Sequence, residues 1–204
     1  ETYRDKSKVK NQKSKHILDK WVISKLNGLI QQITEKLDNY DVTGAARAIE
    51  NFVVNDLSLW YIRRFRKRFQ EAQGTLSFIL LTLSKLTAPF IPFLSEEIYK
   101  GTKNYVPTGH LPKGDKLKTK NSVHLADWPK ADLKLINKKL EQEMEKVRGI
   151  VALALAATAK SGIKVRQPLQ KLEITEKINK DLLVLIKDEI NVKKVIFEVV
   201  NQEA

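Results

Sequence analysis

Residues 18–37 read LDKWVISKLNGLIQQITEKL, and this stretch carries the clearest structural pattern in the sequence. Its apolar residues recur every three or four positions, which is the spacing of the buried face of an amphipathic helix. We therefore predict a helix over residues 15–40. Its expected core positions are Leu18, Trp21, Val22, Leu26, Leu29, Ile30, Ile33 and Leu37.

A second helix is predicted after the turn at residues 39–41, with Thr43 as its N-cap and residues 44 to about 69 as its length. At the α-helical rotation of about 100° per residue, the apolar side chains before Ser58 share one face. Those after Ser58 lie on nearly the opposite face. Either the helix bends near Ser58, or its later half packs on something that the first half does not contact, such as a neighbouring domain.

Residues 70–122 predict two more helices and a long loop. Residues 76–86 are apolar around much of a helix, and two prolines interrupt that helix at residues 87–92. A short helix is expected from Ser95 to Lys103. Residues 104–122 combine proline, glycine and lysine with few apolar side chains, so we predict a solvated loop or hinge there.

A different pattern begins at residue 131 and predicts a separate small unit. Helical spacing continues to about residue 160, and Gly162 ends it. Residues 163–169 then alternate as a strand, and Leu172 and Ile174 extend the run. Pro168 would confine that strand to an edge or bulge. A helix around residues 182–186 and a strand over 192–200 complete the chain.

The predicted fold class is mainly α, a helical bundle followed by a long helix and a small α/β cap. We divide the chain into a flexible basic lead-in at residues 1–15, a helical-bundle domain at 16–130 with its loop at about 104–122, and a C-terminal subdomain at 131–204.

Composition excludes several classes of function. The 204 residues include no cysteine, which removes disulfides, thiol catalysis and iron–sulfur clusters and favours a reducing cytoplasm. His16, His110 and His124 lack metal-ligand spacing, and no glycine-rich phosphate loop occurs. The apolar runs are too short to cross a membrane. We therefore expect no catalytic, cofactor-binding or metal-binding residue.

The charge balance is the first positive indication of a partner. The chain has 37 Lys and Arg against 24 Asp and Glu, a net charge of +13. Residues 1–15 and 101–130 each carry 6 basic and 2 acidic residues, so together they supply +8 of that charge. Such an excess attracts polyanions, which fits nucleic acid or an anionic membrane surface, although a basic protein without either partner stays open.

The densest group of cations lies in residues 60–69, which read WYIRRFRKRF and which we call the basic segment. Arginine forks suit phosphates, and a nearby aromatic ring could stack on an unpaired base. The alternative is a solvated helix end, where cations offset the helix dipole. The candidate RNA-binding residues here are Tyr61, Arg63, Arg64, Arg66, Lys67 and Arg68.

A second candidate contact precedes Pro168. Lys164 and Arg166 alternate with apolar residues, so both cations should leave the same face of the predicted strand. They could contact RNA, or they could form the polar face of a sheet whose other face is apolar. The lysines of residues 1–15 are expected to form a flexible tether, with non-specific RNA attraction as the alternative.

Several stretches resemble the anticodon-binding domain of the isoleucyl-tRNA synthetases, a family of class I aminoacyl-tRNA synthetases. The similar stretches are residues 19–41, AARAIE at 45–50, the basic segment, LSKL at 83–86 running into APFIPFLSEEIY at 88–99, and SVHLADWP at 122–129. The PFLSEE pattern is shared with the valyl, leucyl and methionyl relatives. GIKVRQPL at 162–169 is similar to a segment more particular to the isoleucyl enzymes.

The resemblance implies a non-catalytic module that holds the anticodon arm of tRNA(Ile) for ATP-dependent aminoacylation by an upstream catalytic domain. The full-length enzyme would be a cytoplasmic, monomeric isoleucine–tRNA ligase of protein biosynthesis that uses ATP and Mg. This portion would bind neither, because the family's nucleotide-binding motifs do not occur here. The alternatives are the same module from a valyl-type sibling, or a basic helical scaffold for protein interactions.

Overall fold

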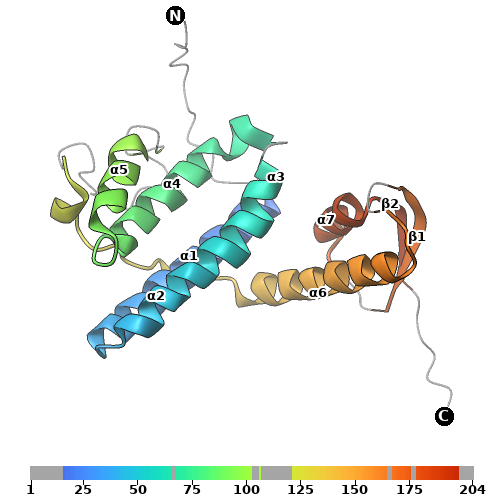
Figure 1. The fold of residues 1–204 in the computed structure, drawn as a ribbon, viewed down its shortest axis with the longest axis horizontal. Helices are drawn as coiled ribbons and strands as arrows, with labels where there is room; N and C mark the ends of the chain where they lie inside the picture. Colours follow the sequence, from blue (N-terminus) through green and yellow to red (C-terminus); the bar gives the residue numbers. More distant parts are fainter. Residues whose placement is uncertain are drawn as a thin grey trace, which may run out of the picture. The chain divides into compact units, whose positions relative to one another are not determined.

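The computed structural model describes residues 16–65, 68–102, 106, 121–164, 167–175 and 178–197. It confirms the mainly helical fold class, with one small sheet near the C-terminus (Figure 1). The chain divides into two units, Glu1–Ile136 and Asn137–Ala204. The predicted lead-in at 1–15 and nearly all of the predicted loop at 104–122 lie outside the described residues.

The first unit is a helical bundle (Figure 1). Its elements are α1 (Ile17–Asp38), α2 (Val42–Asn51), the π-helical segment η1 (Phe52–Ile62), α3 (Arg63–Phe65), α4 (Phe69–Thr87), α5 (Pro92–Thr102) and the single 3₁₀ turns η5 (Val123–Leu125) and η6 (Leu133–Leu135).

Helix α1 forms the centre of this bundle, since it packs against α2, η1, α4 and η6. The predicted apolar stripe is buried except at Leu37, which is half-buried, and Trp21, Leu26 and Ile33 are each at most 1% exposed. The helix begins after His16, whose Nδ1 accepts the amide of Leu18 at 3.2 Å. The prediction of this helix is therefore confirmed, because local periodicity alone specifies which of its faces is buried.

The start of the second helix differs from the prediction. Helix α2 begins at Val42, and its N-cap is Asp41 rather than Thr43. The Asp41 carboxylate accepts the amide of Gly44 at 2.8 Å and the Lys36 ammonium at 2.7 Å. Those two interactions lower the pKa of Asp41, with the lysine contact first. A carboxylate satisfies the free amides of a helix start as a hydroxyl does and also complements the dipole, so Asp41 takes the cap position.

The change of buried face that the sequence indicated near Ser58 arises from helix type. Residues Phe52–Ile62 are π-helical, and their buried members, Phe52, Asp56, Leu57 and Tyr61, recur every four or five positions. A π-helix closes its hydrogen bonds between residues five apart, so each turn holds more residues than an α-helical turn. Those four side chains consequently share one face of the π-helical segment.

Helices α4 and α5 close the other side of the bundle, and η5 packs against both. Leu81, Tyr99 and Val123 form a small apolar cluster between these three elements. The Glu96 carboxylate fixes this arrangement by accepting the Ser122 hydroxyl at 2.9 Å and the Val123 amide at 2.8 Å. The amide of Val123, followed by the Ser122 hydroxyl, lowers the pKa of Glu96.

The first unit extends to Ile136, whereas the sequence analysis placed the domain boundary after residue 130. The amide of Asp132 donates to Asn27 Oδ1 at 2.7 Å, and η6 contacts α1. These contacts attach residues 132–135 to the bundle. The long helix α6 accordingly begins at Lys138, not at residue 131, with Asn137 as its N-cap.

The second unit contains α6 (Lys138–Lys160), β1 (Leu169–Ile174), α7 (Lys180–Ile190) and β2 (Val192–Phe197) (Figure 1). The two strands pair in parallel, with Leu169 opposite Val192 and Ile174 opposite Phe197. Helix α7 connects them, as parallel pairing requires a crossover. Its apolar face, with Leu182 and Ile186 both 0% exposed, packs against α6, which contributes Met144 and Val147.

The first strand starts later than the sequence pattern indicated. The prediction of a strand from Ile163 is wrong, because β1 begins at Leu169, after Pro168. Gly162 adopts φ +67° at the end of α6, and the amide of Gln167 donates to Lys164 O at 2.8 Å in a turn. Alternating polarity could not reveal that pairing with β2 begins only at Leu169.

Within the part of the chain that the structure describes, none of the helices combines the length and apolar character needed to cross a bilayer.

Candidate functional site

The basic segment lies where η1, α3 and the first turn of α4 follow one another in the first unit. Arg66 and Lys67 fall outside the described residues, so only part of the predicted set can be placed. The placed members differ sharply in environment. Arg63 is exposed, Arg64 and Arg68 are half-buried, and Tyr61 is 0% exposed.

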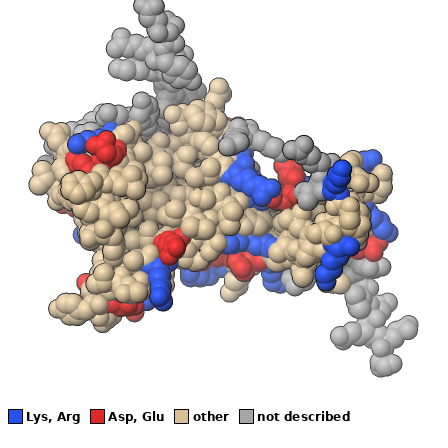
Figure 2. Space-filling model, viewed as in Figure 1, with Lys and Arg blue, Asp and Glu red and all other residues tan. Residues whose placement is uncertain are grey.

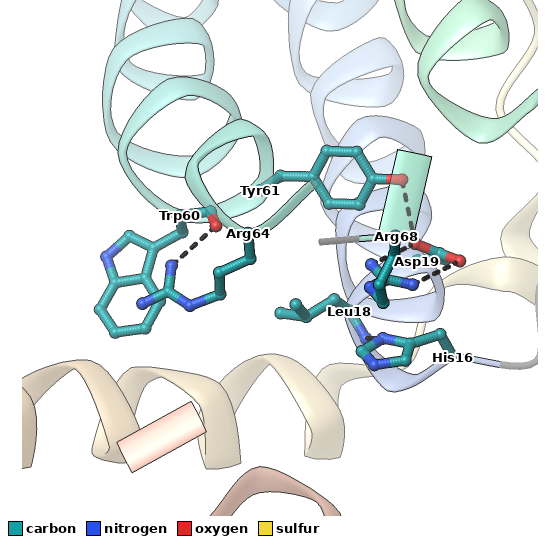
Figure 3. Close-up of polar contacts among 7 residues, drawn as sticks. All are labelled: His16, Leu18, Asp19, Trp60, Tyr61, Arg64 and Arg68. Atoms are coloured by element: carbon teal, nitrogen blue, oxygen red, sulfur yellow. Dashed lines mark hydrogen bonds and ion pairs between the residues drawn. The ribbon is translucent and has the colours of Figure 1, made fainter. Parts of the chain in front are cut away.

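A buried carboxylate on α1 organises this segment (Figure 3). Asp19 is 2% exposed, and its Oδ1 accepts the Tyr61 hydroxyl at 2.9 Å. The Arg68 guanidinium donates to the same carboxylate from both terminal nitrogens, Nη2 to Oδ1 at 3.1 Å and Nη1 to Oδ2 at 3.4 Å. The three residues therefore join the start of α1 to the last turn of η1 and to the N-cap of α4, across 42 and 49 positions of sequence.

This network gives Tyr61 a place in the core rather than on the surface. Burial first, and then the charge of Asp19, raises the pKa of the Tyr61 hydroxyl, so the phenol stays protonated as a hydrogen-bond donor. From the sequence, Tyr61 is a candidate for stacking on an unpaired base. A ring with 0% exposure presents no face for stacking in this structure, so we leave Tyr61 out of the proposed contact surface.

Arg64 is held by Trp60, near the end of the preceding segment η1. Its Cζ lies 4.0 Å from the centroid of the Trp60 ring, and Nη1 donates to the backbone oxygen of Trp60 at 2.7 Å (Figure 3). A guanidinium stacked on an indole face gains from the ring's quadrupole, and the planar group keeps a fixed orientation. Arg64 thus remains a candidate phosphate or base contact whose position is set before any ligand arrives.

Aromatic rings extend from this buried network to the surface. The Tyr61 and Phe65 rings lie 6.3 Å apart between centroids, and the Phe65 and Phe69 rings lie 5.4 Å apart in an edge-to-face arrangement. Exposure rises along the series, from 0% at Tyr61 through 7% at Phe65 to 52% at Phe69. The segment therefore presents an exposed ring, although a different one from the tyrosine that the sequence suggested.

The second candidate contact has no comparable framework among its described residues. Lys164 is exposed in the turn before β1, and Arg166 lies outside the described residues. The prediction that the two cations share a strand face is wrong for Lys164, because the strand begins only at Leu169. On the face drawn in Figure 2, the second unit carries several separate basic groups, some with acidic groups beside them.

Sequence reasoning missed Asp19 and Trp60. Asp19 stands three residues before Val22 and seven before Leu26, so helical spacing puts a carboxylate within the apolar stripe. A buried charge requires a partner, which makes that position a usable signal for a network. The identity of the partners could not be read, because both lie more than forty residues away.

The chemistry available here is recognition of anions. The described residues include no group of three or more His, Asp or Glu that could hold a metal ion. The basic segment offers positioned guanidinium groups and an exposed ring, which suits phosphate and base contacts.

Comparisons with known proteins agree with recognition of an anionic partner at this segment. Residues 19–176 match the family model for the anticodon-binding domain of tRNA ligases. The isoleucine–tRNA ligase of Clostridium tetani is 41% identical over 194 residues, which are 90% of this chain and 18% of that protein. Those of Thermus thermophilus and Pyrococcus horikoshii are 42% identical over 167 residues and 36% identical over 200 residues. These alignments cover 78% and 91% of this chain, and 15% and 18% of the two relatives.

The chain thus spans less than a fifth of the length of these relatives, while the family model covers most of the chain. The matched region includes the whole basic segment, the Asp19 network and the long helix α6. The chain belongs to the family of anticodon-binding domains of tRNA ligases.

Proposed function

We propose that this chain is the anticodon-arm-binding portion of an isoleucine–tRNA ligase and that the basic segment contacts the arm. The observation that carries the proposal is the Asp19 network, which fixes the helix bearing Arg63 and Arg64 within a matched anticodon-binding domain. Phosphate contacts would supply most of the affinity, and unpaired anticodon bases would supply specificity.

The choice of isoleucine rests on the relatives, whose printed names are isoleucine–tRNA ligases. The longer protein would attach isoleucine to tRNA(Ile), with this portion holding the anticodon arm while an upstream catalytic domain acts on the acceptor end. We further propose that the longer protein is a cytoplasmic monomer.

ATP and Mg²⁺ would be bound elsewhere in the longer protein. The residues described here do not fit such a site, because the sequence has no glycine-rich phosphate loop and the described residues gather no metal-binding group. The proposed role of this portion is therefore to position RNA while other parts of the longer protein carry out the ligation.

A fluorescence titration tests the proposal with two RNA hairpins, the anticodon stem-loops of isoleucine and valine tRNAs, each at two salt concentrations. We expect tighter binding of the isoleucine arm, with log affinity falling linearly with log salt. A preference for the valine arm would reassign the chain to a valyl-type enzyme. Binding of neither arm would overturn the RNA role and leave a scaffold for protein interactions.

A further inference from the structure

Phe69 is the exposed end of an aromatic series that starts in the core. Its neighbours in the series, Phe65 and Tyr61, are buried, and Tyr61 is fixed by Asp19. The edge-to-face contact between Phe65 and Phe69, at 5.4 Å and 77°, restrains the Phe69 ring from its inner side. A ring restrained in this way loses little conformational freedom when a ligand binds to it.

More than half of the Phe69 side chain remains exposed, at 52%. Phe69 opens α4, and exposure of a large apolar ring at this position leaves hydrophobic area in water. Covering that area with a flat apolar surface would recover the hydrophobic gain and add a ring–ring contact. The position therefore suits a planar partner.

The charges of the basic segment indicate which kind of planar ligand could bind at Phe69. Arg63 is exposed and Arg64 half-buried on the same segment, whereas the charge of Arg68, directly before Phe69, is paired with Asp19. A ligand here must carry negative charge as well as a flat apolar face. A single-stranded nucleotide has both, whereas a base-paired duplex offers phosphates but hides its base faces in the stack.

We infer that the Phe69 ring stacks on an unpaired base of the bound RNA. This inference rests on the proposed function and makes it more specific, because it assigns base recognition to one side chain. Arg63 and Arg64 contact the RNA through charge, and Phe69 contacts a base without charge. Stacking of this kind tolerates several bases, so Phe69 contributes to affinity for a loop more than to choice among loops.

The test compares the protein with its Phe69→Leu and Phe69→Trp variants, using the isoleucine anticodon stem-loop and a fully paired hairpin with the same number of phosphates. Phe93→Leu is the matched control, because Phe93 lies in the same unit and is 87% exposed. Circular dichroism and urea unfolding verify that each variant is folded. A third RNA replaces the loop bases with abasic sites.

We expect Phe69→Leu to weaken stem-loop binding by about 5-fold or more, as loss of base–aromatic stacking does. Phe69→Trp should retain the affinity, and Phe93→Leu should not change it. The salt dependence should stay as in the unmodified protein, because no phosphate contact is lost. The abasic loop should bind the unmodified protein and Phe69→Leu equally.

Two outcomes overturn the inference alone: equal stem-loop affinity of Phe69→Leu and the unmodified protein, or an equal loss on the paired hairpin. If the unmodified protein binds no RNA, the proposed function fails together with the inference. The titration of the unmodified protein therefore separates the two failures.

Discussion

Two short basic stretches of this protein, both candidate RNA contacts, differ in how the fold holds them. The basic segment at 60–69 is tied to α1 by a buried carboxylate that lies more than forty residues earlier. The pre-strand segment, residues 163–168, contains a local turn between Gln167 and Lys164 after a left-handed glycine. Density of cations thus predicts attraction to RNA, whereas long-range contacts determine whether those cations have fixed positions.

The difference has an energetic basis. Contacting a phosphate with a free lysine requires ordering a long flexible side chain, which costs conformational entropy. Arg64 is already held against Trp60, and Arg68 against Asp19. Binding to a surface held in advance avoids part of that cost. We therefore expect the basic segment, more than the pre-strand segment, to determine RNA affinity.

Removal of the buried Asp19 carboxylate should have the largest effect, because it removes the contacts that anchor the basic segment. Asp19→Ala leaves the Tyr61 hydroxyl and the Arg68 guanidinium without their shared acceptor inside the protein. Breaking a buried ion pair from one side costs about 3 to 5 kcal/mol. We expect a loss of this size in the unfolding free energy of the first unit, measured by urea denaturation. Asp38→Ala, on the exposed side of the same helix, is the control, and a similar loss there would contradict the account.

Arginine and lysine substitutions compare the two segments directly. Arg63→Ala should weaken binding of the isoleucine anticodon stem-loop and lower the slope of log affinity against log salt by about 1, as loss of one phosphate contact does. Lys164→Ala should change both quantities less. Fluorescence titrations over a series of salt concentrations measure the two variants together. A larger slope change for Lys164→Ala would reverse the assignment.

Backbone conformation should matter at Gly162, which directly precedes the pre-strand segment. Gly162 has φ +67°, and a Cβ added there would meet no atom within 4 Å. Gly162→Ala should therefore cost roughly 1 to 2 kcal/mol through backbone strain alone. Gly149→Ala is the matched control, since its added Cβ also has open space but its φ is not positive. We expect that variant to be more stable than the original by about 0.5 to 1 kcal/mol, because alanine favours a helix interior. Thermal unfolding followed by circular dichroism measures both, and equal effects would exclude strain at Gly162.

Acid should destabilise the part of the first unit where Glu96 of α5 accepts hydrogen bonds from Ser122 and Val123. The folded state lowers the pKa of Glu96 below its ordinary value of 4.5, so the stabilisation it gives is present above that value and is lost as the pH falls through the lowered pKa. Thermal unfolding between about pH 3 and 7 should show this loss in the original protein. Glu96→Gln should be less stable at neutral pH and less sensitive to acid. An unchanged acid response would contradict this role of Glu96.

The parts of the structure that depend on local pattern could be predicted from the sequence. Helix α1 follows from its apolar stripe, and α7 and β2 follow from theirs. The π-helical segment could not be predicted, because the division of the apolar residues into two faces at Ser58 depends on an α-helical rotation. The start of β1 depends on a partner strand more than twenty residues later, and alternation alone does not indicate it.

The sequence indicated which cations belong to the candidate site, but it did not indicate the contacts that hold them in place. The cations of the basic segment were found because they are adjacent in sequence. Tyr61 was assigned to the surface because its partner Asp19 lies 42 positions away, and its hydroxyl gave no indication of that contact. Phe69 was not singled out, since exposure depends on what packs nearby and not on residue type.

Hydrogen exchange with and without the isoleucine anticodon stem-loop is the most direct test of the central claim, which is that the anchored basic segment is the RNA contact. Added RNA should slow exchange at amides of the basic segment, and the pre-strand segment should change little. The Arg63→Ala variant should lose most of that protection at the same RNA concentration. Protection confined to the pre-strand segment, with none in residues 60–69, would contradict the claim.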